Sequence, residues 1–345
     1  MSHSLTLALL SLIVLAVLII PFFVRRVEHN LEAFLFVMGV GAAFVSRVLD
    51  ATLIHEALVE PLKITAAVLV AGVVFKVTRH HIRASIQMVV DRLHFGVFMF
   101  LMVFLLGLLS SVITAIIASL VLVEIISGLR MDRRHEVFYV VVACFSIGLG
   151  AALTPIGEPL TTILVAKLKS NPEVNFFWPL KLLGPFIVPG ILALGLVAAF
   201  RKGKPSGDSL DAPEEGEGWR EVAVRGAKVY VFVMALVCLG AGFKPVIDAY
   251  LIRVPAPILY WINIVSAILD NATLTAAEVS PAMDTTQIRD VVMGLCISGG
   301  MLIPGNIPNI ISAGKLKIKS TEWARIGVPL GLVVMLIYFV VLLLV

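Results

Sequence analysis

Two short stretches interrupt hydrophobic segments in the same way: LTPIGEPLTT at residues 153–162 and LIPGNIPNII at residues 302–311. Each contains two prolines separated by three residues, with a glycine between them. Proline lacks a backbone N–H, and its ring clashes with the preceding turn of a helix. Each stretch therefore predicts a break in an otherwise continuous helix.

The flanks of the two breaks also match. Glycine pairs precede them, Gly148 with Gly150 and Gly299 with Gly300. A tryptophan followed by glycine and proline comes after each, at 178–185 and 323–329. Because a single kink is common in membrane helices but a matched pair with matched flanks is not, we interpret the breaks as parts of an internal repeat.

The composition requires a lipid environment. Of the 345 residues 59% are hydrophobic and 14% charged, and the mean hydropathy is +1.03, which exceeds what a soluble domain buries. About 20 apolar residues cross a bilayer. Runs of this kind recur at 5–23, 31–49, 64–77, 137–153, 179–200, 229–243 and 326–345. The predicted class is an all-α polytopic membrane protein, and because Arg25 and Arg26 follow the first run, we expect a permanent span rather than a cleaved signal.

Two further apolar segments, 94–129 and 255–283, are interrupted by polar residues and predict re-entrant hairpins. The first has basic residues at both ends, which places both ends in the cytoplasm. We expect its tip at Ser110 and Ser111. Backbone polar groups at such a tip are tolerated only where they line a cavity or are buried in protein. The second hairpin is interrupted by Asp270, Asn271, Thr273 and Thr275.

These assignments predict a cell-membrane protein of about nine spans and two hairpins, with both termini outside because most of the 27 Lys and Arg residues fall in the alternate loops. Its two repeats would be inverted, an arrangement found in secondary transporters. Broken helices are expected at 137–168 and 290–314. The predicted units are N-terminal scaffold helices at 1–58, a first repeat at 59–200, a solvated linker at 201–220 and a second repeat at 221–345.

Several other classes are disfavoured. A net charge of +4 would suggest nucleic acid for a soluble chain, but here the basic residues lie between spans. Cys144, Cys238 and Cys296 fall inside apolar runs, which indicates small core side chains rather than disulfides. No nucleophile and base pair or metal motif stands out, so we expect neither an enzyme nor a bound cofactor, and a non-transporting membrane enzyme or receptor is the least favoured alternative.

Two segments resemble the ion transporter superfamily, which includes NhaD-type sodium/proton antiporters, ArsB arsenite permeases and sodium-coupled dicarboxylate carriers. Residues 266–277, SAILDNATLTAA, resemble the Asp-Asn-x-Pro/Thr hairpin tip of the antiporters, and 152–159, ALTPIGEP, resemble a Thr-Pro-Ile-Gly-Asn-Pro break. The resemblance covers about residues 95–340, and the chain also looks like a less characterised family of cation transporters within this superfamily. It departs at Ser110-Ser111, where many members carry Ser-Asn-Thr, and at Glu158, where they carry Asn.

The resemblance implies a homodimer in which a fixed scaffold holds a moving transport domain, an elevator arrangement. That domain would contain both hairpins and both broken helices.

Carboxylates inside a membrane are expensive and usually functional, which singles out Glu158 in the first break and Asp270 in the second hairpin. Around them we expect only neutral oxygen donors, which suit a hard cation of the sodium type: freed carbonyls together with Ser110, Ser111, Thr114, Thr154, Asn271, Thr273, Thr275, Asn306 and Asn309. We expect Glu158 and Asp270 to be the charged ligands of that ion.

A buried carboxylate can hold either a proton or a metal ion, and exclusive occupancy would couple their fluxes. The favoured function is therefore Na⁺/H⁺ antiport, with the ions and the lipid bilayer as partners. The alternative is a sodium-coupled symporter of an organic or inorganic anion, of the dicarboxylate or arsenite class, in which half-helix N-termini would bind the anion.

Overall fold

The computed structural model describes residues 3–28, 30–62, 93–129, 131–168, 171–201, 219–250, 254–269, 271–279 and 283–345, together with 65, 66, 69, 70, 73 and 281. This part of the chain is helical, and no strand occurs in it. The predicted all-α class is confirmed for these residues. The predicted span at 64–77 and the linker at 201–220 lie mostly outside them.

Five helices within the described residues are long and apolar enough to cross a membrane. They are α5 (Phe95–Ile113), α7 (Arg133–Ala151), α9 (Trp178–Phe200), α15 (Ser320–Leu344) and the Gly226–Phe243 part of α10 (Trp219–Tyr250). Large apolar side chains are exposed along α15, among them Val333, Leu336, Ile337 and Val340. An apolar surface of this kind is suited to lipid, so the fold is that of a membrane protein.

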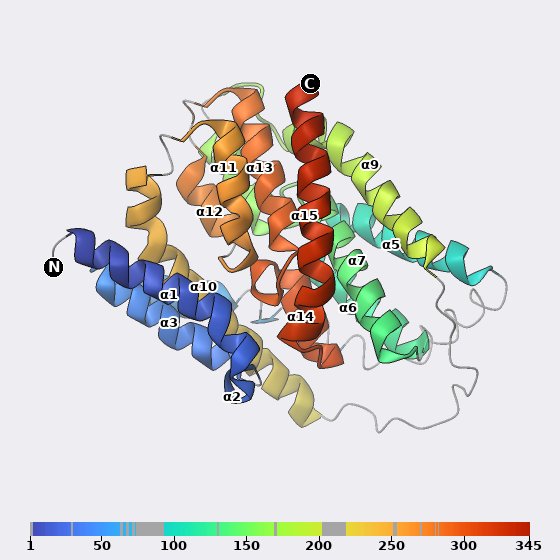
Figure 1. Ribbon diagram of the computed structural model, residues 1–345, viewed down its shortest axis with the longest axis horizontal. Helices are drawn as coiled ribbons and strands as arrows, with labels where there is room; N and C mark the ends of the chain where they lie inside the picture. The colour runs from blue at the N-terminus through green and yellow to red at the C-terminus, as the bar shows by residue number, and fades with distance from the viewer. Residues whose placement is uncertain are drawn as a thin grey trace.

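The N-terminal helices and α10 form one group, in which α3 packs against α10 and α1 packs against α3 (Figure 1). This group contains α1 (His3–Phe23), α2 (Arg25–Glu28), α3 (Leu31–Val45) and α10. Backbones approach closely where α3 meets α10, since a Cβ at Gly39 would lie 2.7 Å from the carbonyl oxygen of Ala235. Glu32 and Lys228 add an ion pair at 2.8 Å. Thus α10, which the sequence assigned to the second repeat, lies beside the predicted scaffold helices.

The larger group is built around α7 and α13 (Thr285–Gly299), which contact each other and are buried along most of their length. Helices α5 and α9 pack on α7, while α11 (Ala256–Ile262) and the short 3₁₀ helix η2 (Asn263–Ala267) pack on α13. A Cβ at Gly150 would lie 1.7 Å from the carbonyl oxygen of Gly107, which explains the glycine there. These two buried helices form the centre of the fold.

Both predicted breaks interrupt a helix. Helix α7 is followed by α8 (Pro159–Lys167), and α13 is followed by η3 (Ile303–Gly305) and α14 (Ile307–Leu316). Helix α6 (Ala115–Leu129), which follows α5, packs against α14, and α12 (Asn271–Glu278), which follows η2, packs against α8. Each short helix after a break therefore lies against a helix from the other half of the chain.

The turn between α5 and α6 lies later than the sequence indicated. Ser110 and Ser111, the predicted tip, occupy the last turn of α5, and the helix is interrupted at Thr114. Thr114 has φ 75° and ψ 150°, a backbone conformation that is strained for a β-branched side chain. The polar residues indicated the region in which the helix is interrupted, but they did not identify Thr114 as the residue at the interruption.

Arg133 joins two loops that the charge pattern predicted on the same side. Its guanidinium binds the Glu322 carboxylate at 2.8 and 2.9 Å, and it also donates to the carbonyl oxygens of Leu316 at 2.9 Å and Lys317 at 2.7 Å. The start of α7 and the α14–α15 turn therefore lie together. These contacts also satisfy carbonyls at the end of α14, which a helix leaves without partners.

Candidate functional site

The first break is closed by hydroxyl groups. Thr161 donates to the carbonyl oxygen of Ala152 at 3.2 Å, and Thr162 donates to that of Pro155 at 2.7 Å. A Cβ at Gly157 would lie 2.0 Å from the carbonyl oxygen of Ala151, so only glycine fits there. The chain folds back on the end of α7 before α8 begins.

The second break is built in the same manner with an amide. Asn309 donates through Nδ2 to the carbonyl oxygens of Gly299 at 2.9 Å and Leu302 at 2.8 Å. A Cβ at Gly305 would lie 2.5 Å from the carbonyl oxygen of Gly299. Several freed carbonyls therefore already accept hydrogen bonds from their own break. The side-chain oxygens are left as the principal candidates for an ion.

Glu158 and Asn306 occupy the same position in the two breaks. Each is the N-cap residue of the following helix, with φ −154°, ψ 160° for Glu158 and φ −155°, ψ 146° for Asn306. Neither side chain caps its own helix, and both are buried, with 6% and 4% exposed. An alignment of the two breaks on their prolines would be one residue out of step with this match. The reason is that Pro159 is the first residue of α8, whereas Pro308 is the second residue of α14.

The two caps face the two central helices in a crossed manner. A Cβ at Gly148 on α7 would lie 2.5 Å from Nδ2 of Asn306. The Glu158 carboxyl interacts electrostatically with the thiol of Cys296 on α13. Gly148 and Cys296 precede the ends of their helices, Ala151 and Gly299, by the same number of residues. Asn306 therefore contacts the central helix of the other half, and Glu158 lies within electrostatic range of the other central helix at the corresponding level.

A buried serine ties each helix pair to its central helix. The Ser110 hydroxyl donates to the carbonyl oxygens of Gly107 at 2.7 Å and Ile147 at 2.9 Å. The Ser266 hydroxyl donates to the carbonyl oxygen of Leu295 at 3.3 Å. Ile147 and Leu295 again hold matching positions in α7 and α13, so Ser266, which the sequence reasoning did not select, is the counterpart of Ser110. The signal that could have found it is a serine at the same distance before α12 as Ser110 is before α6.

The hydroxyls on the return helices bond to their own backbone. Ser119 donates to the carbonyl oxygen of Ala115 at 2.7 Å, and Thr275 donates to that of Asn271 at 2.8 Å. Ala115 and Asn271 are the first residues of α6 and α12. Thr275 was expected as an ion ligand, but its proton serves this intrahelical bond.

The α5–α6 turn is attached directly to the first break. Thr154 is buried and donates to the carbonyl oxygen of Ser111, while the Ala115 amide donates to the carbonyl oxygen of Gly157 at 3.0 Å. Ser111 itself donates to the carbonyl oxygen of Leu108 at 2.7 Å. Thr114 is half-buried beside them. The structure thus brings Ser111, Thr114 and Thr154 close to the segment that carries Glu158.

The predicted residues of the second hairpin are described only in part. Asn271 is buried, and its Nδ2 has no hydrogen-bond partner among the described residues. Asn309 is also buried, and its Oδ1 has no donor in that part of the chain. Asp270 and the side chain of Thr273 lie outside the described residues.

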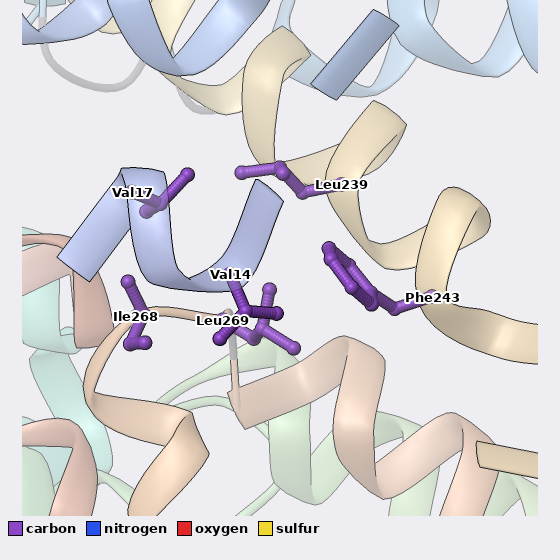
Figure 2. A pocket seen from close by; sticks show the side chains of 6 residues that line it. All are labelled: Val14, Val17, Leu239, Phe243, Ile268 and Leu269. Carbon is purple, nitrogen blue, oxygen red and sulfur yellow. The ribbon is translucent and has the colours of Figure 1, made fainter. Parts of the chain in front are cut away.

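A small apolar cavity lies beside the residues that follow η2 (Figure 2). Val14 and Val17 of α1, Leu239 and Phe243 of α10, and Ile268 and Leu269 line it. No polar side chain contributes to this lining, so the cavity is not an ion site. Across the described residues, no group of three or more His, Cys, Asp or Glu side chains could hold a metal ion.

The fold and the buried polar groups define a helical membrane protein with paired helix breaks at its centre. The chain belongs to the family described as Protein of unknown function (DUF1646), whose sequence pattern matches residues 7–345. No curated protein matches the chain.

Proposed function

We propose that the protein is a secondary active cation transporter, most simply a Na⁺/H⁺ antiporter. The observation that carries this proposal is the crossed arrangement of Glu158 and Asn306, two buried caps that approach the central helices at corresponding levels. Transporters with inverted repeats bind their ions at such interrupted helices near mid-membrane. Glu158 supplies the negative charge, and Asn306 and Thr154 supply neutral oxygens.

Inverted repeats and re-entrant hairpins are part of the proposal. They are supported by the matched helix ends, the paired serines Ser110 and Ser266, and the reciprocal packing of α6 on α14 and α12 on α8. The joining of two basic loops by Arg133 supports an orientation with these loops in the cytoplasm and both termini outside. The proposed relation to the ion transporter superfamily rests on the break and tip sequences.

Coupling would follow from competition at the carboxylates. A buried carboxylate needs a positive partner, which can be a proton or a hard cation. If Glu158 and Asp270 bind either Na⁺ or H⁺ but not both, the transport domain carries only one of the two ions each time it crosses the membrane. This exclusive occupancy is the simplest source of antiport.

The proposed movement is an elevator within a homodimer. The group formed by α1–α3 and α10 would be the scaffold, and the group around α7 and α13 would move. The contact between them at Ile268 and Leu269 is apolar and incompletely filled (Figure 2). These apolar side chains form no hydrogen bonds, so sliding of one group past the other would break few specific interactions at this contact.

A sodium-coupled anion symporter is the second candidate. The N-termini of α8 and α14 lie at the breaks, and helix N-termini attract anions. The buried Nδ2 of Asn271, a donor without an acceptor among the described residues, also favours it. Arsenite, citrate and sulfate would then be substrates to compare.

Flux into proteoliposomes under an imposed pH gradient tests the proposal. We expect Na⁺ or Li⁺ flux that depends on the gradient in the wild type and is lost in Glu158→Gln, while K⁺, arsenite, citrate and sulfate give none. Anion flux that requires Na⁺ would support the symporter instead. Wild-type Na⁺ flux in Glu158→Gln would reject the assignment of the site.

A further inference from the structure

A second buried acidic group lies at the end of α12 and interacts with the start of η2. Glu278 ends α12 and Asn263 begins η2, and each is only 1% exposed. Both carboxyl oxygens of Glu278 and the Oδ1 of Asn263 have no hydrogen-bond donor among the described residues. Three buried acceptor atoms without a donor are costly, so this place lacks a positive charge or a proton.

The Asn263 side chain is held in one orientation. Its Nδ2 donates to the carbonyl oxygen of Val291 at 3.2 Å, and its own backbone carbonyl accepts from the Ser298 hydroxyl at 2.6 Å. The carbonyl oxygen of Val291 can only accept a hydrogen bond, so the NH₂ group of Asn263 points toward it. The Oδ1 atom of the same amide is then directed away from Val291. The Asn263 side chain lies within interaction range of the Glu278 carboxyl. Its Oδ1 has no donor of its own among the described residues, so it is free to accept from a proton on Glu278.

Within the described part of the chain, no charged group compensates Glu278. Arg289 on α13 binds Asp290 at 2.9 Å and the carbonyl oxygen of Leu342 at 3.3 Å, not Glu278. The helices packed against α12 are α8, α10 and α13. None of the other described titratable side chains on these three helices or at their N-caps interacts with the Glu278 carboxyl. These side chains include Glu158, Lys167, Arg220, Lys228, Tyr230, Cys238 and Cys296.

A proton satisfies this arrangement better than a metal ion. Hard metal cations take about six oxygen ligands, and Glu278 with Asn263 offers three. A proton on Glu278 converts one carboxyl oxygen into a donor, and its hydrogen bond to Oδ1 of Asn263 satisfies two of the three orphan atoms. It also removes the charge, which burial disfavours.

We propose that Glu278 is a proton-binding site of its own, in which the protonated carboxyl donates a hydrogen bond to Oδ1 of Asn263. The corresponding position in the first half carries no acid. Counted from the first residue of each return helix, the position of Glu278 in α12 corresponds to Leu122 in α6, which is fully buried. The site is therefore specific to the second half and separate from Glu158.

Infrared spectroscopy of the purified protein at pH 7 tests this protonation without any transport assay. We expect a carbonyl stretching band of a protonated carboxyl, shifted in D₂O, that is lost in Glu278→Gln. The variant should fold, because the glutamine amide can donate to Asn263 in place of the acid proton. Glu124→Gln, which changes another buried glutamate on a return helix, should leave the band in place.

Asn263→Leu provides an independent variant with Glu278 intact. Removal of the acceptor should move the Glu278 band to higher frequency, because an acid that donates no hydrogen bond has a stronger C=O bond. A merely structural Asn263 would leave the band where it is. Identical spectra of the wild type and Glu278→Gln at pH 7 would overturn the proposal, since the carboxyl would then be ionised.

The consequence for transport rests on the proposed antiport. If Glu278 carries the exchanged proton, Glu278→Gln should retain Na⁺ binding but lose flux driven by the pH gradient. Flux without the protonated band would refute the Glu278 site alone. A band without any cation flux in the wild type would refute the antiport and leave the site.

Discussion

The two halves of the chain share their backbone contacts and differ in where they carry charge. Ser110 and Ser266 make the same kind of bond to matching carbonyls of α7 and α13. At the caps, however, Glu158 corresponds to Asn306, and on α6 and α12 Leu122 corresponds to Glu278. The two halves therefore match in these backbone contacts, and the proposed chemistry depends on the differences between them.

The largest effect is expected from the cap that carries charge. Glu158→Gln should weaken cation binding about 10- to 100-fold, because a charge-assisted interaction contributes about 1.5–3 kcal/mol. Asn306→Ala removes a neutral oxygen and should have the smaller effect of the two. Isotope flux in proteoliposomes measures both. Equal losses would mean that the two caps are functionally alike, contrary to the charge difference.

Asp270→Asn should also abolish coupled flux if Asp270 is the second carboxylate of the site. The substitution keeps the size of the side chain and removes its charge. Gel filtration should show that the variant is folded, and its thermal unfolding midpoint should equal that of the wild type. Full flux in this variant would remove Asp270 from the proposed ligands.

The breaks should be the positions least tolerant of an added methyl group. Gly157→Ala and Gly305→Ala place a Cβ 2.0 and 2.5 Å from carbonyl oxygens of the preceding helix, and overpacking of this kind costs about 1–3 kcal/mol. Gly314→Ala is the matched control, because nothing lies within 4 Å of its added Cβ. Thermal unfolding should rank Gly157→Ala lowest and Gly314→Ala near the wild type.

Thr114→Gly should raise stability by about 1 kcal/mol, since glycine adopts the positive φ of this turn without strain. Ile113→Gly, one residue earlier and still inside α5, should lower it by a comparable amount. Thermal midpoints of the two variants measure the difference. A destabilised Thr114→Gly would mean that the threonine side chain contributes more than its backbone strain costs.

The smallest effect separates the two serines. Ser110 bonds to two carbonyls at 2.7 and 2.9 Å, whereas Ser266 has one partner at 3.3 Å. With a net contribution of about 0.5–1.5 kcal/mol for a good hydrogen bond, Ser110→Ala should lower the free energy of unfolding more than Ser266→Ala. Chemical denaturation of the two variants measures this difference, and a larger loss of stability in Ser266→Ala would contradict the prediction.

The sequence predicted the parts of this fold that depend on local chemistry. Hydropathy indicated the membrane helices, and the proline and glycine pattern located both breaks. It could not place the breaks in register, because proline is compatible with either of the first two positions of a helix. Only the backbone shows that Glu158 matches Asn306.

The candidate site was less predictable than the fold. Sequence reasoning selects oxygens but does not show which of them already serve their own backbone, as with the hydroxyl of Thr275. The proximity of Glu278 and Asn263 depends on how α12 returns toward η2. Nothing local to either residue encodes that contact.

Na⁺ binding to the purified protein tests the central claim most directly. Isotope binding should be saturable in the wild type and should fall as protons compete at low pH. It should be weakened about 10- to 100-fold in Glu158→Gln, while the Glu124→Gln control binds normally. Unchanged Na⁺ binding in folded Glu158→Gln would contradict the account, because the buried cap of the first break would then not hold the ion.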